Sequence, residues 1–148
     1  MLKFDIFIVK ILFRMLQEVC DIIMKLYMYA DVTKMVHYST DKNHAHELCD
    51  IIRGNILDFA DELAEQFFGY SGKPSFSDFS FDQSINKTDD LGQLCKVVSE
   101  MIDEFRGKCD NDDKLSNIVS LIDDFKGDMA KDAFLATFDK VSDYKIEG

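Results

Sequence analysis

The residues of this chain best suited to chemistry lie between positions 37 and 65. All three histidines fall in this stretch, and several acidic residues follow them: His37, His44, His46, Asp50, Asp58, Asp61, Glu62 and Glu65. Imidazole and carboxylate groups together form the ligand set of many oxidative and hydrolytic metal sites. The stretch is therefore either a metal site or a solvated acidic face.

Four of these residues share one side of a helix. His46, Asp50, Asp61 and Glu65 are separated by 4, 11 and 4 residues, which gives rotations of about 40°, 20° and 40° at roughly 100° per residue. The apolar residues of the segment lie about 200° to 320° around from His46. They are Leu48, Cys49, Ile52, Ile56, Phe59, Ala60, Leu63 and Phe67. The stripe should therefore point away from the core. Leu57, Ala64 and Phe68 share the sector of His46, so we expect a contact surface there.

The composition indicates one all-α domain spanning residues 1–148. The chain is 47% hydrophobic and contains one proline and seven glycines, while apolar residues recur at helical spacing through most of it. We expect four helices, at about 4–38, 42–70, 89–106 and 113–141. Caps are expected within Ser39-Thr40-Asp41 for the second helix and at Thr88 or Asp89 for the third.

The longest connection predicts how the helices are joined. A second helix of about 28 residues is roughly 42 Å long, and the connection of about 16 residues from Ser71 to Asn86 reaches about 53 Å when extended. This connection can therefore run the length of the bundle. The pattern predicts a ferritin-like four-helix bundle with one long crossover between helices 2 and 3. The Glu-x-x-His pairs that a ferritin core site needs are absent, which disfavours a metal site in the core.

Charge and cysteine content exclude several classes of protein. The net charge is −11, which disfavours DNA binding and suits cations, although solubility alone explains it equally well. Cys20, Cys49, Cys95 and Cys109 sit within helical patterns and are expected to be reduced.

The apolar opening Phe4 to Phe13 is too short to span a membrane and lacks a cleavage site. We expect a cytoplasmic protein without a membrane partner, in which residues 1–14 extend the first helix or act as an interaction arm.

Two copies of the second helix would bring the separated ligands together. Asp50 and Asp61 are about 16 Å apart along one helix, too far to share an ion. In an antiparallel pair the numbers of facing residues add up to a constant, and both His46 with Glu65 and Asp50 with Asp61 give 111. The two-fold axis then passes near Gly54 to Ile56, where the glycine allows close approach. Two equivalent ion sites would result, each built from both subunits.

This arrangement resembles the Dps branch of the ferritin-like proteins, the mini-ferritins. The residues that match the family pattern are His37, His46 and Asp50 from one chain and Asp61 and Glu65 from its partner. The segment from Asp61 to Glu65 and the Gly-Pro exit at 69–74 also resemble the family. The nine-residue spacing of His37 and His46 is shorter than usual, as in phage-encoded Dps-like proteins. His44 could also replace one of these two ligands. Tyr38 stands in place of the usual Trp, Gln66 in place of Arg, and a Lys-rich tail is missing.

The resemblance implies a hollow dodecamer that binds Fe²⁺ at two-fold interfaces, oxidises it with peroxide or O₂ and stores the product, which protects against oxidative damage. Iron is the expected metal, with zinc or another divalent ion as the alternative. The expected location is the cytoplasm of a bacterium or of a phage-infected cell. The alternative function is a catalytically silent helical scaffold or interaction protein, which the short histidine spacing and the missing Trp favour.

Overall fold

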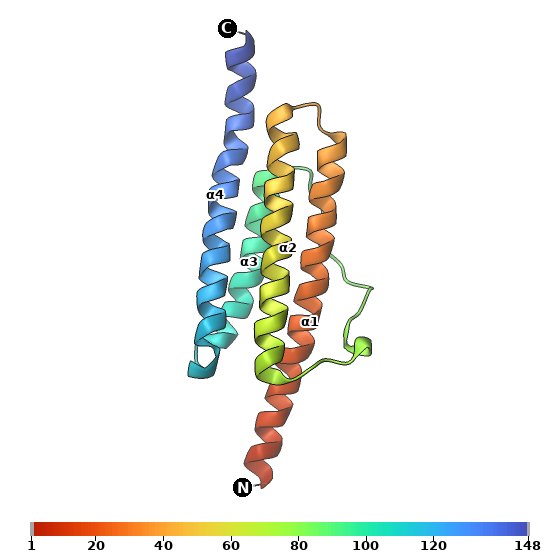
Figure 1. Ribbon diagram of the computed structural model, residues 1–148, viewed down its shortest axis with the longest axis vertical. Coiled ribbons are helices and arrows are strands. Elements are labelled where there is room, and N and C mark those ends of the chain that lie inside the picture. The colour runs from red at the N-terminus through yellow and green to blue at the C-terminus, as the bar shows by residue number, and fades with distance from the viewer. Residues whose placement is uncertain (1, 148) are drawn as a thin grey trace.

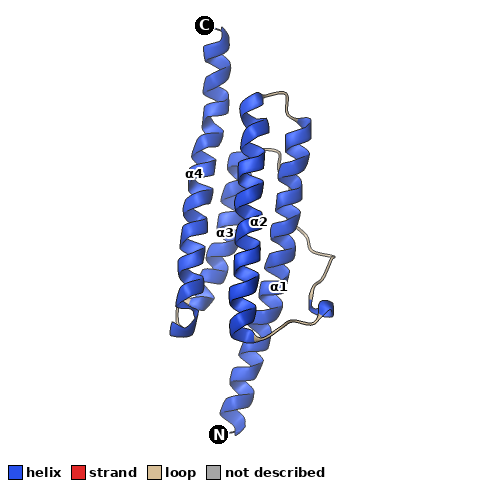
Figure 2. Cartoon of the chain, viewed as in Figure 1, coloured by secondary structure: helices blue, strands red, loops and turns tan. Residues whose placement is uncertain are grey.

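The protein is a bundle of four long helices. A computed structural model describes the backbone of residues 2–147 and the side chains of residues 6–138. The four helices are α1 (Leu2–Ser39), α2 (Asn43–Ser71), α3 (Leu91–Cys109) and α4 (Ser116–Glu147) (Figure 1). Two short 3₁₀ turns, η1 (Phe76–Asp78) and η2 (Asp113–Leu115), lie between them, and no strand occurs in residues 2–147 (Figure 2). The predicted all-helical bundle is confirmed.

The apolar stripe of each helix forms one shared core. All eight residues predicted as the buried side of α2 are buried, together with Ala45. Phe59 of α2 stacks on Phe125 of α4, with ring centroids 4.0 Å apart. Burying such side chains supplies most of the folding free energy of a bundle. Because the core takes this side of α2, the predicted ligand stripe is left outside.

The helix ends correct two sequence predictions. The cap of α2 is the backbone of Lys42, without a side-chain cap, whereas Ser39 is the last residue of α1 and its hydroxyl donates to Val36 O. At α3 the cap is Asp90, whose carboxylate accepts the Gln93 N–H at 3.1 Å. Each helix therefore begins one or more residues later than expected, because the polar residues before it shape the turn instead.

The segment 72–90 follows α1. Gln17 of α1 donates to Asp78 at 2.7 Å, Gln83 donates to Asp21 at 2.9 Å, and the Asn86 N–H donates to the Tyr29 hydroxyl. The partners on α1 advance with the segment, from 17 to 29. Figure 1 shows this loop beside α1, between the end of α2 and the start of α3.

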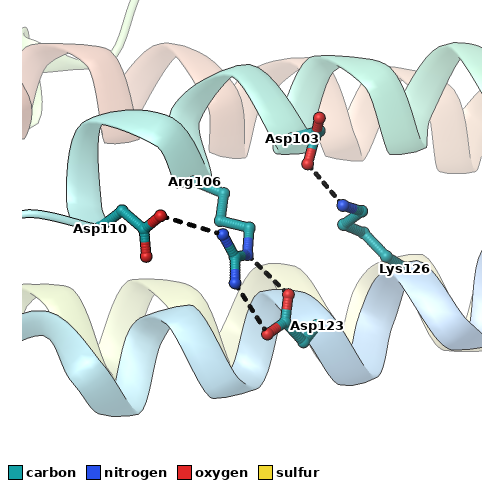
Figure 3. A network of polar contacts seen from close by, with 5 residues as sticks. All are labelled: Asp103, Arg106, Asp110, Asp123 and Lys126. Atoms are coloured by element: carbon teal, nitrogen blue, oxygen red, sulfur yellow. Dashed lines mark hydrogen bonds and ion pairs between the residues drawn. The ribbon is translucent and has the colours of Figure 1, made fainter.

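Ion pairs join α3 and α4 on the surface. Arg106 forms a two-pronged pair with Asp123, with N–O distances of 2.7 and 3.2 Å, and also contacts Asp110. Lys126 pairs with Asp103 one turn away. Figure 3 shows both pairs bridging the two helices. Such exposed pairs contribute little each, but they satisfy these carboxylates.

Two helices project beyond the bundle at opposite ends (Figure 1). The start of α1 extends past the end of α2, and the last part of α4 extends past the turn between α1 and α2. Phe134 and Phe138 continue the helical spacing of the buried Phe125 and Met129 along α4 but are exposed, because the core ends before them. Among residues 2–147, no helix combines the length and apolar character needed to cross a membrane.

Candidate metal-binding site

Two of the three histidines contact each other at the turn between α1 and α2. His37 lies in the last turn of α1 and His46 in the first turn of α2, and their rings stack with centroids 3.6 Å apart. The Nδ1 of His37 lies 2.8 Å from the carbonyl oxygen of His46, and the Nδ1 of His46 lies 2.9 Å from that of His37. The nine-residue spacing allows this reciprocal contact because it leaves a tight turn between the two helices.

This contact determines which ring nitrogen can bind a metal. A carbonyl oxygen only accepts hydrogen bonds, so each Nδ1 must carry the proton and donate it. In the neutral ring the lone pair then lies on Nε2. Metal-binding histidines are usually held in this way, with one ring N–H donated to a carbonyl or carboxylate. His37 and His46 therefore each have Nε2 in the unprotonated form that can bind a metal.

A carboxylate lies beside the histidine pair. Asp50, one turn after His46, places Oδ1 3.6 Å from His37 Nδ1 and 3.7 Å from Lys34 Nζ. Its side chain is 58% exposed. The carboxylate is therefore available to a ligand arriving from solvent, with Lys34 as its present counter-ion.

The third histidine has a different position. His44 Nε2 lies 2.8 Å from the carbonyl oxygen of Leu135 on α4. It therefore connects the start of α2 to α4, and this nitrogen is already used. We therefore assign His44 a structural role at the contact between α2 and α4.

The two remaining predicted ligands lie elsewhere on α2. Asp61 and Glu65 are both exposed and lie three to four turns beyond Asp50, a separation of about 16 Å or more. Within the described part of the chain, no group of three or more His, Cys, Asp or Glu residues is placed to hold a metal ion. The structure thus joins His37, His46 and Asp50 and keeps Asp61 and Glu65 apart from them.

The surface of α2 between these two groups is open. A Cβ built on Gly54 would meet no described heavy atom within 4 Å, and Ile51 beside it is 52% exposed. A glycine inside a helix costs about 1 kcal/mol relative to alanine, and nothing in the described part of its own chain requires one here. Leu57, Ala64 and Phe68 are covered partly by their own chain, with Phe68 against Phe79, so these three residues do not require a partner.

Sequence reasoning missed one buried carboxylate and its polar partner. Asp132 on α4 is 1% exposed and accepts a 2.7 Å hydrogen bond from Asn55 Nδ2 on α2. Burial raises the pKa of this carboxyl, and the Asn55 hydrogen bond acts in the opposite direction. The sequence feature that could have predicted the burial of Asp132 is its position, three residues after Met129 and seven after Phe125 in the buried stripe of α4. Asp132 is buried and Asn55 is half-buried, and the pair joins α2 to α4 one turn before Leu135, the contact of His44.

The four cysteines are free and buried, as predicted. Burial raises the pKa of Cys20, Cys49 and Cys109 to about 11 and that of Cys95 to about 12. The thiols are therefore protonated at neutral pH, and protonated thiols are poor metal ligands.

Comparison with family models, with curated proteins and with solved structures finds no match to this chain.

Proposed function

We propose that the protein is a ferritin-like oligomer of the Dps type, which binds Fe²⁺ between two subunits, oxidises it and stores the product. The observation that carries the proposal is the reciprocal contact of His37 and His46 beside Asp50. It leaves the Nε2 atoms of both rings without a proton, beside an exposed carboxylate, as an incomplete ligand set; His46 is exposed, and the side chain of His37 is 12% exposed. Carboxylates and imidazoles suit both Fe²⁺ and Fe³⁺.

The helix connections support the ferritin-like part of the proposal. The segment 72–90 runs along α1 through Asp78, Gln83 and Asn86. The last turn of α3 then lies beside the first half of α1, where Lys108 pairs with Glu18. The second and third helices consequently run in the same direction. One long crossover of this kind distinguishes ferritin-like bundles from up-and-down bundles.

A second copy completes the ligand set. When two α2 helices pack antiparallel about a two-fold axis near Gly54 to Ile56, Asp61 of one copy lies level with Asp50 of the other, and Glu65 lies level with His46. The uncovered Gly54 is the place where the backbones approach. A dodecamer with an internal cavity follows from the family resemblance.

Iron is the substrate in this mechanism. Asp61 and Glu65 hold one Fe²⁺, and His37, His46 and Asp50 of the other subunit complete the site and hold a second, weaker ion. Each Fe²⁺ gives one electron to peroxide, so that two Fe²⁺, one H₂O₂ and two protons yield two Fe³⁺ and two waters. The carboxylates stabilise the higher charge of Fe³⁺, while protein on both sides of the ion limits the escape of radicals.

Mixing two inactive variants tests the shared site. One variant carries His37→Ala and His46→Ala, and the other carries Asp61→Ala and Glu65→Ala. Each alone should fail to oxidise Fe²⁺. After dissociation and reassembly together, half of the dimers contain one chain of each kind, and each such dimer has one intact site. The mixture should therefore regain about a quarter of the wild-type rate.

The control is a pair of variants at exposed acids away from α2, Asp82→Ala and Glu100→Ala, which should oxidise Fe²⁺ at the wild-type rate. A mixture that stays inactive although it reassembles would contradict a site shared between subunits. Wild-type protein that neither binds nor oxidises Fe²⁺ would instead support a catalytically silent scaffold.

A further inference from the structure

The start of α1 is a helix with apolar side chains that its own chain does not cover. Six apolar side chains there are between 42% and 63% exposed: Ile6, Phe7, Ile8, Val9, Ile11 and Phe13. With roughly 100 Å² exposed by each, they form an apolar surface on the order of 600 Å², at the upper limit of what monomeric proteins leave in water. We call residues 6–14 the arm. Such a surface indicates a binding partner.

One side of the arm is both aromatic and basic. Phe7, Lys10 and Arg14 are spaced three and four residues apart, which places them within about 60° of one another on the helix. Residues 6–17 contain no acidic residue, whereas the whole chain has a net charge of −11. The arm therefore differs in sign of charge from the rest of the molecule.

A groove between α2 and α4 has the complementary character. Its apolar floor is formed by Phe59, Leu121 and Phe125, and its volume is about 170 Å³. A cavity of about 150 Å³ is enough to hold a benzene ring, so the groove matches one phenylalanine side chain in size.

Exposed carboxylates line both sides of this groove. They are Asp58 and Glu62 on α2 and Asp124 and Asp128 on α4. None of the four forms an ion pair with a lysine or arginine within the described side chains, in contrast to Asp123, which Arg106 holds. On each helix the two carboxylates are four residues apart, as are Lys10 and Arg14, which corresponds to about 6 Å on a helix.

We propose that the arm of one copy docks in this groove of a second copy, with Phe7 in the groove and with Lys10 and Arg14 paired to the carboxylates beside it. The arm cannot reach its own groove, because it continues α1 without a break and projects beyond the end of the bundle (Figure 1). The contact joins two different surfaces, so it links each copy to a further one and differs from the two-fold pairing of α2. The proposal does not depend on iron chemistry.

Charge reversal tests this contact. Lys10→Glu with Arg14→Glu, and separately Asp124→Lys with Asp128→Lys, should each weaken self-association about tenfold. Mass is measured against protein concentration by light scattering at low salt. The chain carrying all four changes should associate like the wild type, because the charges are exchanged. Phe7→Ala should weaken association without being rescued by the groove changes.

The matched control reverses two exposed acids outside the groove, Asp82→Lys and Glu100→Lys, and should change association by less than twofold. A direct readout is an intersubunit disulfide between Lys10→Cys and Asp124→Cys, which should form on mild oxidation, whereas Lys10→Cys with Glu100→Cys should not. The proposal is overturned if the four-change chain fails to regain association, or if the wild-type chain stays unassociated and binds anionic lipid vesicles through the arm instead.

Discussion

His37 and His46 each donate Nδ1–H to the other's backbone carbonyl, at 2.8 and 2.9 Å, while their rings stack at 3.6 Å. This relationship does two things at once. It closes the turn between α1 and α2, and it leaves both Nε2 atoms as acceptors. The same residues therefore contribute to the fold and to the proposed iron site.

Substitutions of His37 and His44 should differ in their effect on metal binding, because only His37 belongs to the proposed iron site. His37→Ala removes a hydrogen bond and a ring contact and should lower the free energy of unfolding by about 1–2 kcal/mol. It should also weaken Fe²⁺ or Zn²⁺ binding at least tenfold. His44→Ala removes the contact to Leu135 and should cost about 0.5–1.5 kcal/mol without changing metal affinity. Denaturant unfolding and metal titration by calorimetry measure both; equal metal losses in the two variants would contradict the assignment.

Gly54 predicts where two subunits meet. Gly54→Ala should stabilise the helix by about 0.8–1.0 kcal/mol, because a Cβ has free space within the chain. Gly54→Leu should instead prevent α2 helices from packing and should lower the mass of the assembly measured in sedimentation experiments. Gly107→Leu is the control, since Gly107 on α3 also has open space around it and should have no effect on the dimer. A dimer that tolerates Gly54→Leu would place the two-fold contact elsewhere.

Asp132 predicts a pH dependence of stability. Its pKa in the folded state is raised above the unfolded value by burial, so the folded protein binds this proton more tightly, and stability is lost as pH rises through the raised pKa. Asp132→Asn removes the buried charge and should stabilise the protein at pH 7 on the order of 1 kcal/mol.

This gain should shrink as the pH is lowered through the raised pKa of Asp132. Urea unfolding at several pH values measures it, and Asp82→Asn, at an exposed acid outside the groove, provides the control without a comparable gain. If Asp132→Asn destabilises the protein at pH 7 as much as at low pH, the ionised carboxylate is not the unfavourable group.

The burial of the four cysteines predicts that their thiols react slowly with a labelling reagent. Burial and raised pKa values of about 11 to 12 keep all four thiols protonated at pH 7. A thiol reagent should therefore label the folded protein slowly and all four sites rapidly after unfolding in urea. Rapid labelling of one thiol in folded protein would show that its helix opens locally.

Periodicity predicted the helices well because each one buries a continuous apolar stripe, as the eight buried residues of α2 show. The same spacing continues along α4 to Phe134 and Phe138, which are exposed, because an apolar stripe does not reveal where its partner helices end. The caps were misplaced because Ser39 hydrogen-bonds back to Val36 within α1, and Thr88 accepts the Asp90 N–H in the turn before α3. The stacking of His37 on His46 depends on the turn geometry, which the sequence does not state. Whether Asp61 and Glu65 meet these histidines depends on a second copy of the chain.

The most direct test of a site shared between subunits is the position of bound metal. Crystals soaked in Fe²⁺ without oxygen, or in Zn²⁺, should show an anomalous difference peak between His46 of one subunit and Asp61 of its two-fold partner. His37, Asp50 and Glu65 should contribute the neighbouring ligands. A subunit pair without metal at this position, or with metal bound entirely by residues of one chain, would contradict the account.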